Sequence, residues 1–463
     1  MPKDTKRKYW LVSGLYALFE KGSAFLFGFG SVFILYRTLE EEVMGTWVLF
    51  LMTCAFLEVS RIGLIQNALV KYLSAEPKIE HGKINAASFL LNGLLSLFYA
   101  LLLLTIAPFL GQLWNPAIIP LLHIYILTTT ILTLLYQCNF VLQANLSFKG
   151  IFMSNAIKQG IFFSFLLILW LLGRPIELIQ LAWFQVFGAV VGSIIAIYFA
   201  WPFLVFSKKI DWGWIRKLLA FGKFAVSTNI STMLYKNMDK MMLGSLISAG
   251  SVVVYDLAIR ITNALEIPVF SAAAVVFPQS AREMVDNGKE GVKKMYEHSV
   301  AAILALLLPV ILFVEIFPEP LILLIAGEDY LSSTPILRLT ILFGFFLPFA
   351  NQMGTVLESI GKPNINFYCT ALGFIINIIF NYLFILKYGV IGAAYGTLIT
   401  YFITFIITQT ILYKMLGVNI LNVFLNLNKY YFQAYIFLKD KIKHFLIKPK
   451  TTTSNIPPKE QQS

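Results

Sequence analysis

The sequence predicts an all-α membrane protein of about twelve transmembrane helices, arranged as two pseudo-symmetric six-helix bundles around a central cavity. Composition, recurring apolar segments and an internal repeat support this fold class. Of the 463 residues, 58% are hydrophobic and only 13% are charged, whereas soluble domains carry roughly 25% charged residues. The mean hydropathy is +0.76. Such a composition is typical of a chain that lies in lipid.

Apolar segments of about 20 residues, long enough to cross a hydrocarbon core of roughly 30 Å as a helix, recur along the chain. The spans predicted for the first half are 10–36, 43–73, 86–110, 118–141, 151–172 and 176–206. Those of the second half are 220–243, 251–281, 299–326, 336–360, 365–386 and 390–413. We therefore predict an N-terminal six-helix bundle (1–206), a cytoplasmic linker (207–219), a C-terminal six-helix bundle (220–415) and a cytoplasmic amphipathic and disordered tail (416–463).

The distribution of basic residues predicts the orientation of these helices. Positive residues between spans stay on the cytoplasmic side when a segment inserts. With the N-terminus inside, only Arg37, Arg174, Arg338 and Lys387 of the 36 lysines and arginines fall in outer connections. Both termini are therefore expected in the cytoplasm. Because the basic residues lie between helices, the net charge of +12 does not indicate a nucleic-acid partner.

An internal repeat relates the two halves. A shift of about 208 residues places the segment 56–59 on 264–267, and thereby Glu58 on Glu266. Two six-helix halves that enter from the same side form a parallel repeat about an axis along the membrane normal. The last helix of each half also carries a GxxxG pattern, Gly188 with Gly192 and Gly392 with Gly396. Such a pattern allows two helix backbones to approach closely.

Ten ionisable residues lie well inside the predicted spans, all on the first two helices of each half. They are Glu20, Lys21, Glu58, Arg61, Lys236, Asp239, Lys240, Asp256, Arg260 and Glu266. At ~2.5 kcal/mol or more each, exposing them to lipid would cost on the order of 25 kcal/mol. We therefore expect these four helices to line a polar cavity. Lys149, Lys158 and Lys223, near the inner ends of helices, would make its cytoplasmic mouth positive.

Spacing along the helices leaves two interpretations of these charges open. Asp256 and Arg260 are four residues apart, and Glu58 and Arg61 are three apart, so each pair shares a helix face. The pairs could lock helices together without binding a ligand, or they could line the cavity. Five acids against five bases leave the set formally neutral.

Motifs of enzymes are missing from the sequence. It contains no Walker-type GxxxxGK[ST], no HExxH, no DxD and no Cys/His cluster at metal spacing. The four histidines are scattered. We therefore expect neither an enzyme nor a cofactor or metal site.

Several segments resemble a known transporter family. Asn237 to Gly244, Tyr255 to Ala258 and Val276 to Ser280 resemble the seventh and eighth helices of polysaccharide-export flippases. These are the O-antigen translocase type of the multidrug/oligosaccharidyl-lipid/polysaccharide exporter superfamily. Gly361 to Pro363, Asn377 with Asn381, and Tyr388 to Ala394 are similar to that family's final three helices. The resemblance covers most of the chain and is stronger after Phe221.

The resemblance implies a flippase that uses alternating access. It would carry an undecaprenyl-diphosphate-linked oligosaccharide, a polysaccharide repeat unit, from the cytoplasmic to the periplasmic leaflet. By this analogy the residues that contact the substrate in the cavity are Lys21, Arg61, Lys236, Lys240, Arg260, Asn229 and Asn263. The residues for ion coupling or counter-charge are Glu58, Asp239, Asp256 and Glu266.

The alternative function is an ion-coupled exporter of the multidrug-extrusion type, which would share the twelve helices and the two halves. A basic inner mouth argues against cationic drugs. A membrane-bound polymerase or glycosyltransferase would need a large outer loop or an acidic metal motif, and the sequence has neither. The expected partners are a lipid-linked oligosaccharide and membrane lipids, with a polysaccharide polymerase as a further candidate. The expected location is the cell inner membrane.

Overall fold

The computed structural model describes residues 3–207 and 209–446, and within these ranges every regular element is a helix. The chain divides into two compact units. The first comprises Met1–Asn263, Val314–Ile341 and Leu372–Thr400, and the second comprises Ala264–Phe313, Leu342–Ala371 and Tyr401–Ser463. The predicted division into two six-helix bundles at residue 206 stays a prediction.

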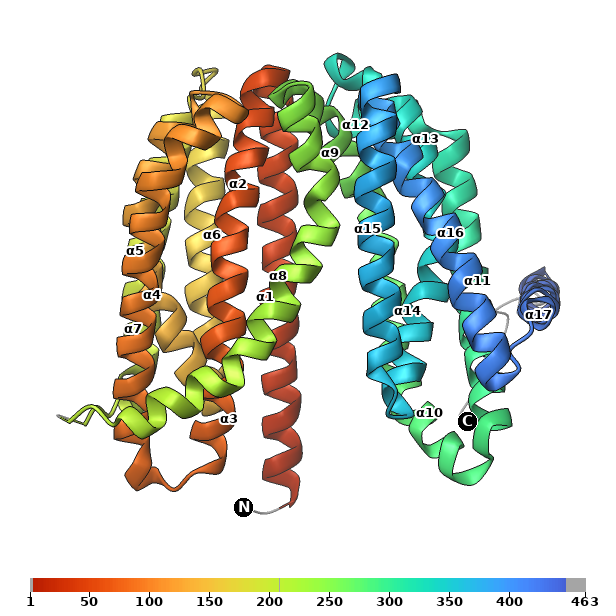
Figure 1. Ribbon diagram of the computed structural model, residues 1–463, viewed down its shortest axis with the longest axis horizontal. Coiled ribbons are helices and arrows are strands. Elements are labelled where there is room, and N and C mark those ends of the chain that lie inside the picture. Colours follow the sequence, from red (N-terminus) through yellow and green to blue (C-terminus); the bar gives the residue numbers. More distant parts are fainter. Residues whose placement is uncertain (1–2, 208, 447–463) are drawn as a thin grey trace, which may run out of the picture. The chain divides into compact units, whose positions relative to one another are not determined.

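The first unit holds most of the helices labelled in Figure 1. Its elements are α1 (Lys3–Thr38), α2 (Glu41–Arg61), the π-helix η1 (Ile62–Gln66), α3 (Asn67–Ala75), α4 (Lys78–Leu113), α5 (Ile118–Ala144), α6 (Phe148–Leu171), α7 (Leu178–Ala200), η2 (Trp201–Phe203), α8 (Trp212–Leu246), α9 (Ala249–Asn263), α12 (Pro318–Ile325), η3 (Glu328–Ser333) and α13 (Thr334–Ile341). The second unit holds α10 (Glu266–Asp286), most of α11 (Gly288–Ile316), α14 (Phe343–Ser359) and α17 (Ile420–Leu446). Two helices, α15 (Pro363–Tyr388) and α16 (Val390–Leu416), contribute to both units.

The prediction of an all-α membrane protein is confirmed. In the described part of the chain, nine helices are long and apolar enough to cross a membrane, and a tenth candidate is the bent pair 328–341 and 343–359. These ten match ten of the predicted spans. The other two predicted spans are also helical, as α8 and as α9 with α10. They carry Lys236, Asp239, Lys240, Asp256 and Arg260, which make them less apolar than a helix surrounded by lipid.

The predicted span 251–281 is not one continuous helix. It breaks between Asn263, where α9 ends, and Glu266, where α10 begins. Pro268 explains the break, because proline has no N–H for the carbonyl oxygen of Ala264 and its ring clashes with that carbonyl. The boundary between the two compact units falls at the same place, after Asn263.

Helix packing in the first unit places α2 at the centre of the charged residues. It packs against both α8 and α9, while α5 lies against α4 and α7, and α6 lies against α1 and α7. Many large apolar side chains point outward, among them Phe25, Leu97, Trp183 and Ile194. Apolar exposure on this scale is typical of a surface covered by lipid rather than water.

Both GxxxG patterns lie at close helix contacts. A Cβ on Gly188 of α7 would lie 2.7 Å from the carbonyl oxygen of Lys158 on α6. A Cβ on Gly396 of α16 would lie 2.8 Å from the backbone nitrogen of Asn381 on α15. Any side chain at these glycines would push the helices apart, so the glycines fix where Lys158 and Asn381 sit.

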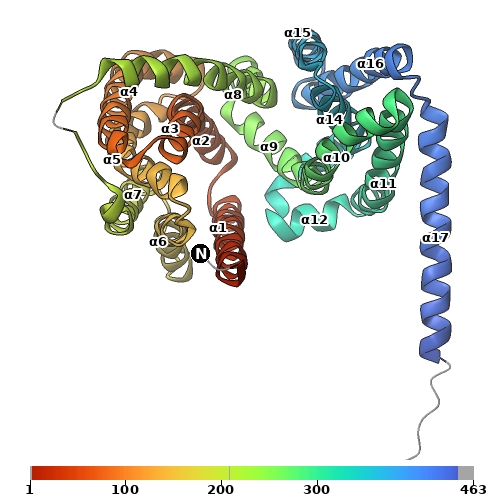
Figure 2. The same ribbon diagram turned by 90° about the horizontal axis from the view of Figure 1, so that it is seen from below.

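The C-terminal helix α17 forms the amphipathic part of the predicted tail, and residues 447–463, for which a disordered end is predicted, lie outside the described residues. Figure 1 shows α17 end-on while α16 runs up the picture, and Figure 2 shows α17 along its length, so α17 lies crosswise to α16. Glu297 anchors its start by accepting hydrogen bonds from the backbone of Asn419 (2.8 Å) and the amide of Asn422 (3.0 Å). Val423 packs into the second unit, whereas Phe432 is exposed. An exposed apolar face on a lysine-containing helix is typical of helices that lie on a membrane surface.

We expect the exposed face of α17 to contact lipid in the full-length protein. In a Cys369→Ser background, where Cys54 and Cys138 are buried, an environment-sensitive fluorophore on Phe432→Cys should be quenched by lipids that carry a quencher near their headgroups. The same fluorophore on Gln433→Cys, one step round the helix, should be quenched much less. Equal quenching at the two positions would contradict this arrangement.

Candidate functional site

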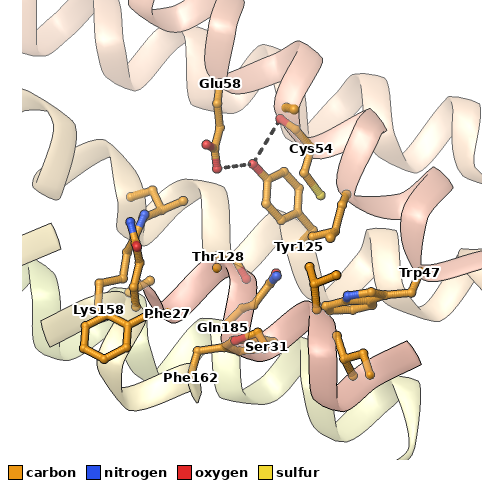
Figure 3. Close-up of a pocket in the computed structure, with 18 of the residues that line it drawn as sticks. Phe27, Ser31, Trp47, Cys54, Glu58, Tyr125, Thr128, Lys158, Phe162 and Gln185 are labelled. Carbon is orange, nitrogen blue, oxygen red and sulfur yellow. Dashed lines mark hydrogen bonds between the residues drawn. The ribbon is translucent and has the colours of Figure 1, made fainter. Parts of the chain in front are cut away.

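The first unit holds a half-open cavity of about 320 Å³, drawn in Figure 3. Side chains from α1, α2, α5, α6, α7 and α9 line it, and most of the lining is apolar. The polar lining residues are Ser31, Glu58, Tyr125, Thr128, Lys158, Gln159, Gln185 and Arg260. In Figure 3, Lys158 and Trp47 lie on opposite sides of the cavity, with Tyr125 and Gln185 between them. The mixture of apolar walls and a few convergent polar groups is that of a small-molecule site.

Glu58 is held by two tyrosines of α5. Its carboxylate oxygens accept hydrogen bonds from the hydroxyl of Tyr125 at 3.0 Å and from that of Tyr136 at 2.8 Å. Both bonds orient the carboxylate at the cavity wall. They also leave fewer of its lone pairs for a ligand.

Arg61 is buried and turned towards α4 and α5. Its guanidinium donates to the hydroxyls of Ser96 (2.9 Å) and Thr129 (3.0 Å), and its Cζ lies 5.5 Å from the ring centre of Tyr99. Among the residues that the structure describes, no ion pair joins Arg61 to Glu58. Their i, i+3 spacing places Glu58 and Arg61 on the same face of α2, but each residue forms its hydrogen bonds with side chains of neighbouring helices.

Asp256 is the centre of a buried ionic cluster. Lys240 on α8 places its Nζ 2.6 Å from Oδ1, and the guanidinium of Arg260, one turn along α9, pairs with Oδ2. Tyr36 on α1 donates its hydroxyl to Oδ2 at 3.0 Å. We call Tyr36, Lys240, Asp256 and Arg260 the Asp256 cluster. Its two cations outnumber its one carboxylate, and the side chain of Arg260, 40% exposed, lines the cavity.

Asp239 forms a second buried cluster with α9, α15 and α16. Its Oδ2 accepts hydrogen bonds from the hydroxyls of Tyr255 (2.6 Å) and Thr397 (3.0 Å). The amides of Asn377 and Asn381 both donate to Thr397 at 3.2 Å. In the described part of the chain the buried Oδ1 atoms of Asp239, Asn377 and Asn381 have no hydrogen-bond partner. We call these five residues the Asp239 cluster.

The oxygen atoms of the Asp239 cluster are suited to a proton or a small hard cation. Carboxylate, amide and hydroxyl oxygens are the ligands that such cations prefer. Buried polar atoms normally have hydrogen-bond partners, and the side chains of these three unpartnered oxygens are linked through Thr397. A positive ligand would satisfy them.

The remaining predicted site residues are dispersed. Lys21 is exposed and pairs with Glu20 at 3.1 Å. Lys236 on α8 and Asn263 at the end of α9 are exposed, and Asn229 is half-buried beside Gly63. Glu266 lies in the first turn of α10 in the second unit.

The structure thus brings together part of the predicted site. Lys240, Asp256 and Arg260 form one cluster, and Arg260 shares a cavity with Glu58. None of Lys21, Arg61, Lys236, Asn229 and Asn263 is among the residues that line that cavity. Asp239 forms its own cluster.

Sequence reasoning missed several residues that line the cavity or belong to the two clusters. Tyr36, Thr397, Gln159 and Gln185 carry no charge and therefore gave no signal in apolar segments. Asn377 and Asn381 were named only because they resemble residues of the family, and they were not among the predicted site residues. Their spacing of four residues in an apolar helix would have indicated a polar face.

Sequence comparisons connect the chain with polysaccharide biosynthesis. A family model described as polysaccharide biosynthesis protein matches residues 34–335. The uncharacterized membrane protein MJ1068 of Methanocaldococcus jannaschii is 30% identical over 243 residues, which cover 51% of this chain and 46% of that protein. Agl15 of Haloferax volcanii, a probable low-salt glycan biosynthesis flippase, is 21% identical over 186 residues, covering 40% and 39%. The matches thus span less than half the length of these relatives.

Structural comparisons identify the fold. An inward-facing multidrug resistance MATE family transporter of the MOP superfamily aligns with a TM-score of 0.73 at 16% identity, covering 83% of this chain and 93% of that one. The lipid II flippase MurJ in an inward closed conformation aligns with a TM-score of 0.72 at 16% identity, covering 95% and 94%. The chain is a multi-pass membrane protein with the helical fold of these two proteins.

Proposed function

This chain belongs to the family of polysaccharide biosynthesis proteins, and on that premise we propose that it is a flippase for a lipid-linked oligosaccharide. The substrate would be an undecaprenyl-diphosphate-linked repeat unit that moves from the cytoplasmic to the outer leaflet by alternating access. The names of a sequence relative, a probable glycan flippase, and of a structural neighbour, a lipid II flippase, support this proposal.

The observation that carries the proposal is the Asp256 cluster, which is buried within the first unit. A lipid-linked diphosphate needs a polar site with positive charge for its headgroup. Two cations share one carboxylate, and the partly exposed guanidinium of Arg260 lines a cavity. A planar guanidinium is well suited to phosphate oxygens. Arg260 and Lys240 are therefore our first candidates for the headgroup contact, with Lys236, Lys21 and Arg61 as further candidates.

We propose that the Asp239 cluster binds the ion that is coupled to transport. Its unpartnered oxygens are suited to a proton or a small monovalent cation, and binding there would change the packing of α8 against α16. Glu58 and Glu266 remain candidates because of their symmetric positions in the repeat. We further propose that the protein lies in the cell inner membrane with both termini in the cytoplasm, and that a polysaccharide polymerase receives its product.

The proposal predicts that Arg260→Ala and Lys236→Ala lower export while the protein stays inserted and abundant. Asp256 keeps Lys240 and Tyr36 as partners after Arg260 is removed, so the fold should persist. A hydrogen bond to a charged group contributes about 1.5–3 kcal/mol, so loss of a headgroup contact should reduce transport by roughly tenfold or more. The measurement is the amount of surface glycan in a deletion strain complemented by each variant.

The matched control is Arg282→Ala, which removes an exposed basic side chain in the second unit and should leave export unchanged. Normal surface glycan with both variants would contradict the headgroup assignment. The leaflet that accumulates lipid-linked sugar in the deletion strain tests the flippase itself. Accumulation in the inner leaflet is expected, whereas unchanged leaflets together with drug sensitivity would favour the multidrug exporter.

A further inference from the structure

We infer that the cavity of the first unit binds a single sugar ring that carries an anionic group, and that Lys158 contacts this group. The inference rests on the proposed function, because it assigns one residue of the transported glycan to a defined site. A volume of about 320 Å³ lies at the small end of the roughly 300–1,000 Å³ that small-molecule sites occupy. The cavity therefore suits one monosaccharide unit rather than an oligosaccharide.

Lys158 lies near the middle of α6 (Phe148–Leu171) rather than at its inner end. The glycines of α7 position it, because Gly188 and Gly192 lie against its backbone and its Cβ. Its ammonium lies 5.9 Å from the ring centre of Tyr136. In the described part of the chain no carboxylate lies within 4 Å of this ammonium to form an ion pair.

Of the three charged side chains that line the cavity, Lys158 is the one without an ion-pair or hydrogen-bond partner among the described residues. Glu58 already accepts two tyrosine hydroxyls, and Arg260 is paired with Asp256. An ammonium at membrane depth is costly unless it is paired or hydrated. A carboxylate or phosphate on the ligand would supply that partner.

The rest of the lining fits a sugar ring. The amides of Gln159 and Gln185 and the hydroxyls of Ser31 and Thr128 can donate to and accept from sugar hydroxyls. Phe27 and Phe162, both half-buried, supply aromatic surface in the lining, and the almost wholly buried Trp47 stacks on Phe162 with ring centroids 6.4 Å apart. Aromatic rings together with several amides and hydroxyls suit a sugar ring, which has an apolar face and many hydroxyls.

Binding of three monosaccharide probes to the full-length protein in nanodiscs tests the inference. The probes are D-glucuronate, D-glucose 1-phosphate and D-glucose, and saturation-transfer NMR titrations give their dissociation constants. We expect at least one anionic probe to bind about tenfold more tightly than glucose. A preference for glucuronate would indicate a uronic acid in the glycan, and a preference for glucose 1-phosphate would indicate a sugar phosphate.

Two variants decide the role of Lys158. Lys158→Gln should remove the preference for the anionic probe. Lys71→Gln should keep it, because Lys71 also sits over an aromatic ring, that of Phe221 at 4.6 Å, but does not line the cavity. The inference is overturned if glucose binds as tightly as the anionic probes, if none binds saturably, or if Lys158→Gln keeps the preference.

These outcomes are separable from failure of the flippase proposal. If binding fails while the wild-type gene still restores surface glycan to the deletion strain, the sugar subsite is wrong and the flippase proposal stands. If the wild-type gene restores no glycan and the lipid-linked sugar shows no change of leaflet, the flippase proposal fails whatever the probes do.

Discussion

Replacing Asp256 with asparagine is expected to destabilise the protein more than any other single change in the charged helices. The substitution keeps the shape of the side chain but removes the only carboxylate of the Asp256 cluster. Lys240 is 13% exposed in its side chain and lies 2.6 Å from Oδ1, so it would be left as a buried charge beside Arg260. Breaking a buried ion pair by removing one partner costs about 3–5 kcal/mol.

The measurement is the thermal unfolding midpoint of the purified protein, followed by loss of the monodisperse peak on size-exclusion chromatography after heating. Asp256→Asn should lower the midpoint clearly, whereas Asp286→Asn, at an exposed aspartate, should not. The double variant Asp256→Asn with Lys240→Met should recover part of the loss, because the stranded ammonium is gone. An unchanged midpoint for the single variant would mean that the cluster does not stabilise the fold.

Asp239→Asn is expected to cause the largest loss of transport with the fold retained. An asparagine can still accept hydrogen bonds from the hydroxyls of Tyr255 and Thr397, so the packing of the Asp239 cluster should survive. The substitution removes the negative charge that would attract a proton or cation to the three unpartnered oxygens. We expect export to fall at least tenfold and its dependence on the coupling ion to disappear.

The test follows transport by the reconstituted protein under imposed sodium and proton gradients. Thr397→Ser, which keeps the hydroxyl, serves as the control and should retain most of the activity and its ion dependence. Wild-type transport and ion dependence in Asp239→Asn would rule out coupling at this cluster. In that case Glu58→Gln and Glu266→Gln become the informative pair.

Local spacing correctly indicated only one of the two charged pairs. Asp256 and Arg260 are four residues apart in α9 and form an ion pair, as the acid-base interpretation expected. Glu58 and Arg61 are three apart but bind different partners, tyrosines for Glu58 and Ser96 with Thr129 for Arg61. Side-chain spacing shows which residues share a face, but a neighbouring helix can offer better partners.

The break at Ala264 and Leu265 shows a similar limit. The apolar pattern predicted one long span from 251 to 281, and Pro268 was visible within it. A proline can kink a helix or end it, and hydropathy does not distinguish the two. The structure ends α9 there and begins α10 in the other unit.

The order of residues is enough to predict an all-α, multi-pass membrane protein, because apolar length and the cost of burying charge depend on composition and order alone. It also located the charges on the helices that now hold the Asp256 and Asp239 clusters. The packing of the helices sets which charges meet, brings Lys158 to the wall of a cavity, and places Thr397, with Asn377 and Asn381 bonded to it, against Asp239. These contacts join helices far apart in sequence, and helix packing alone sets their distances.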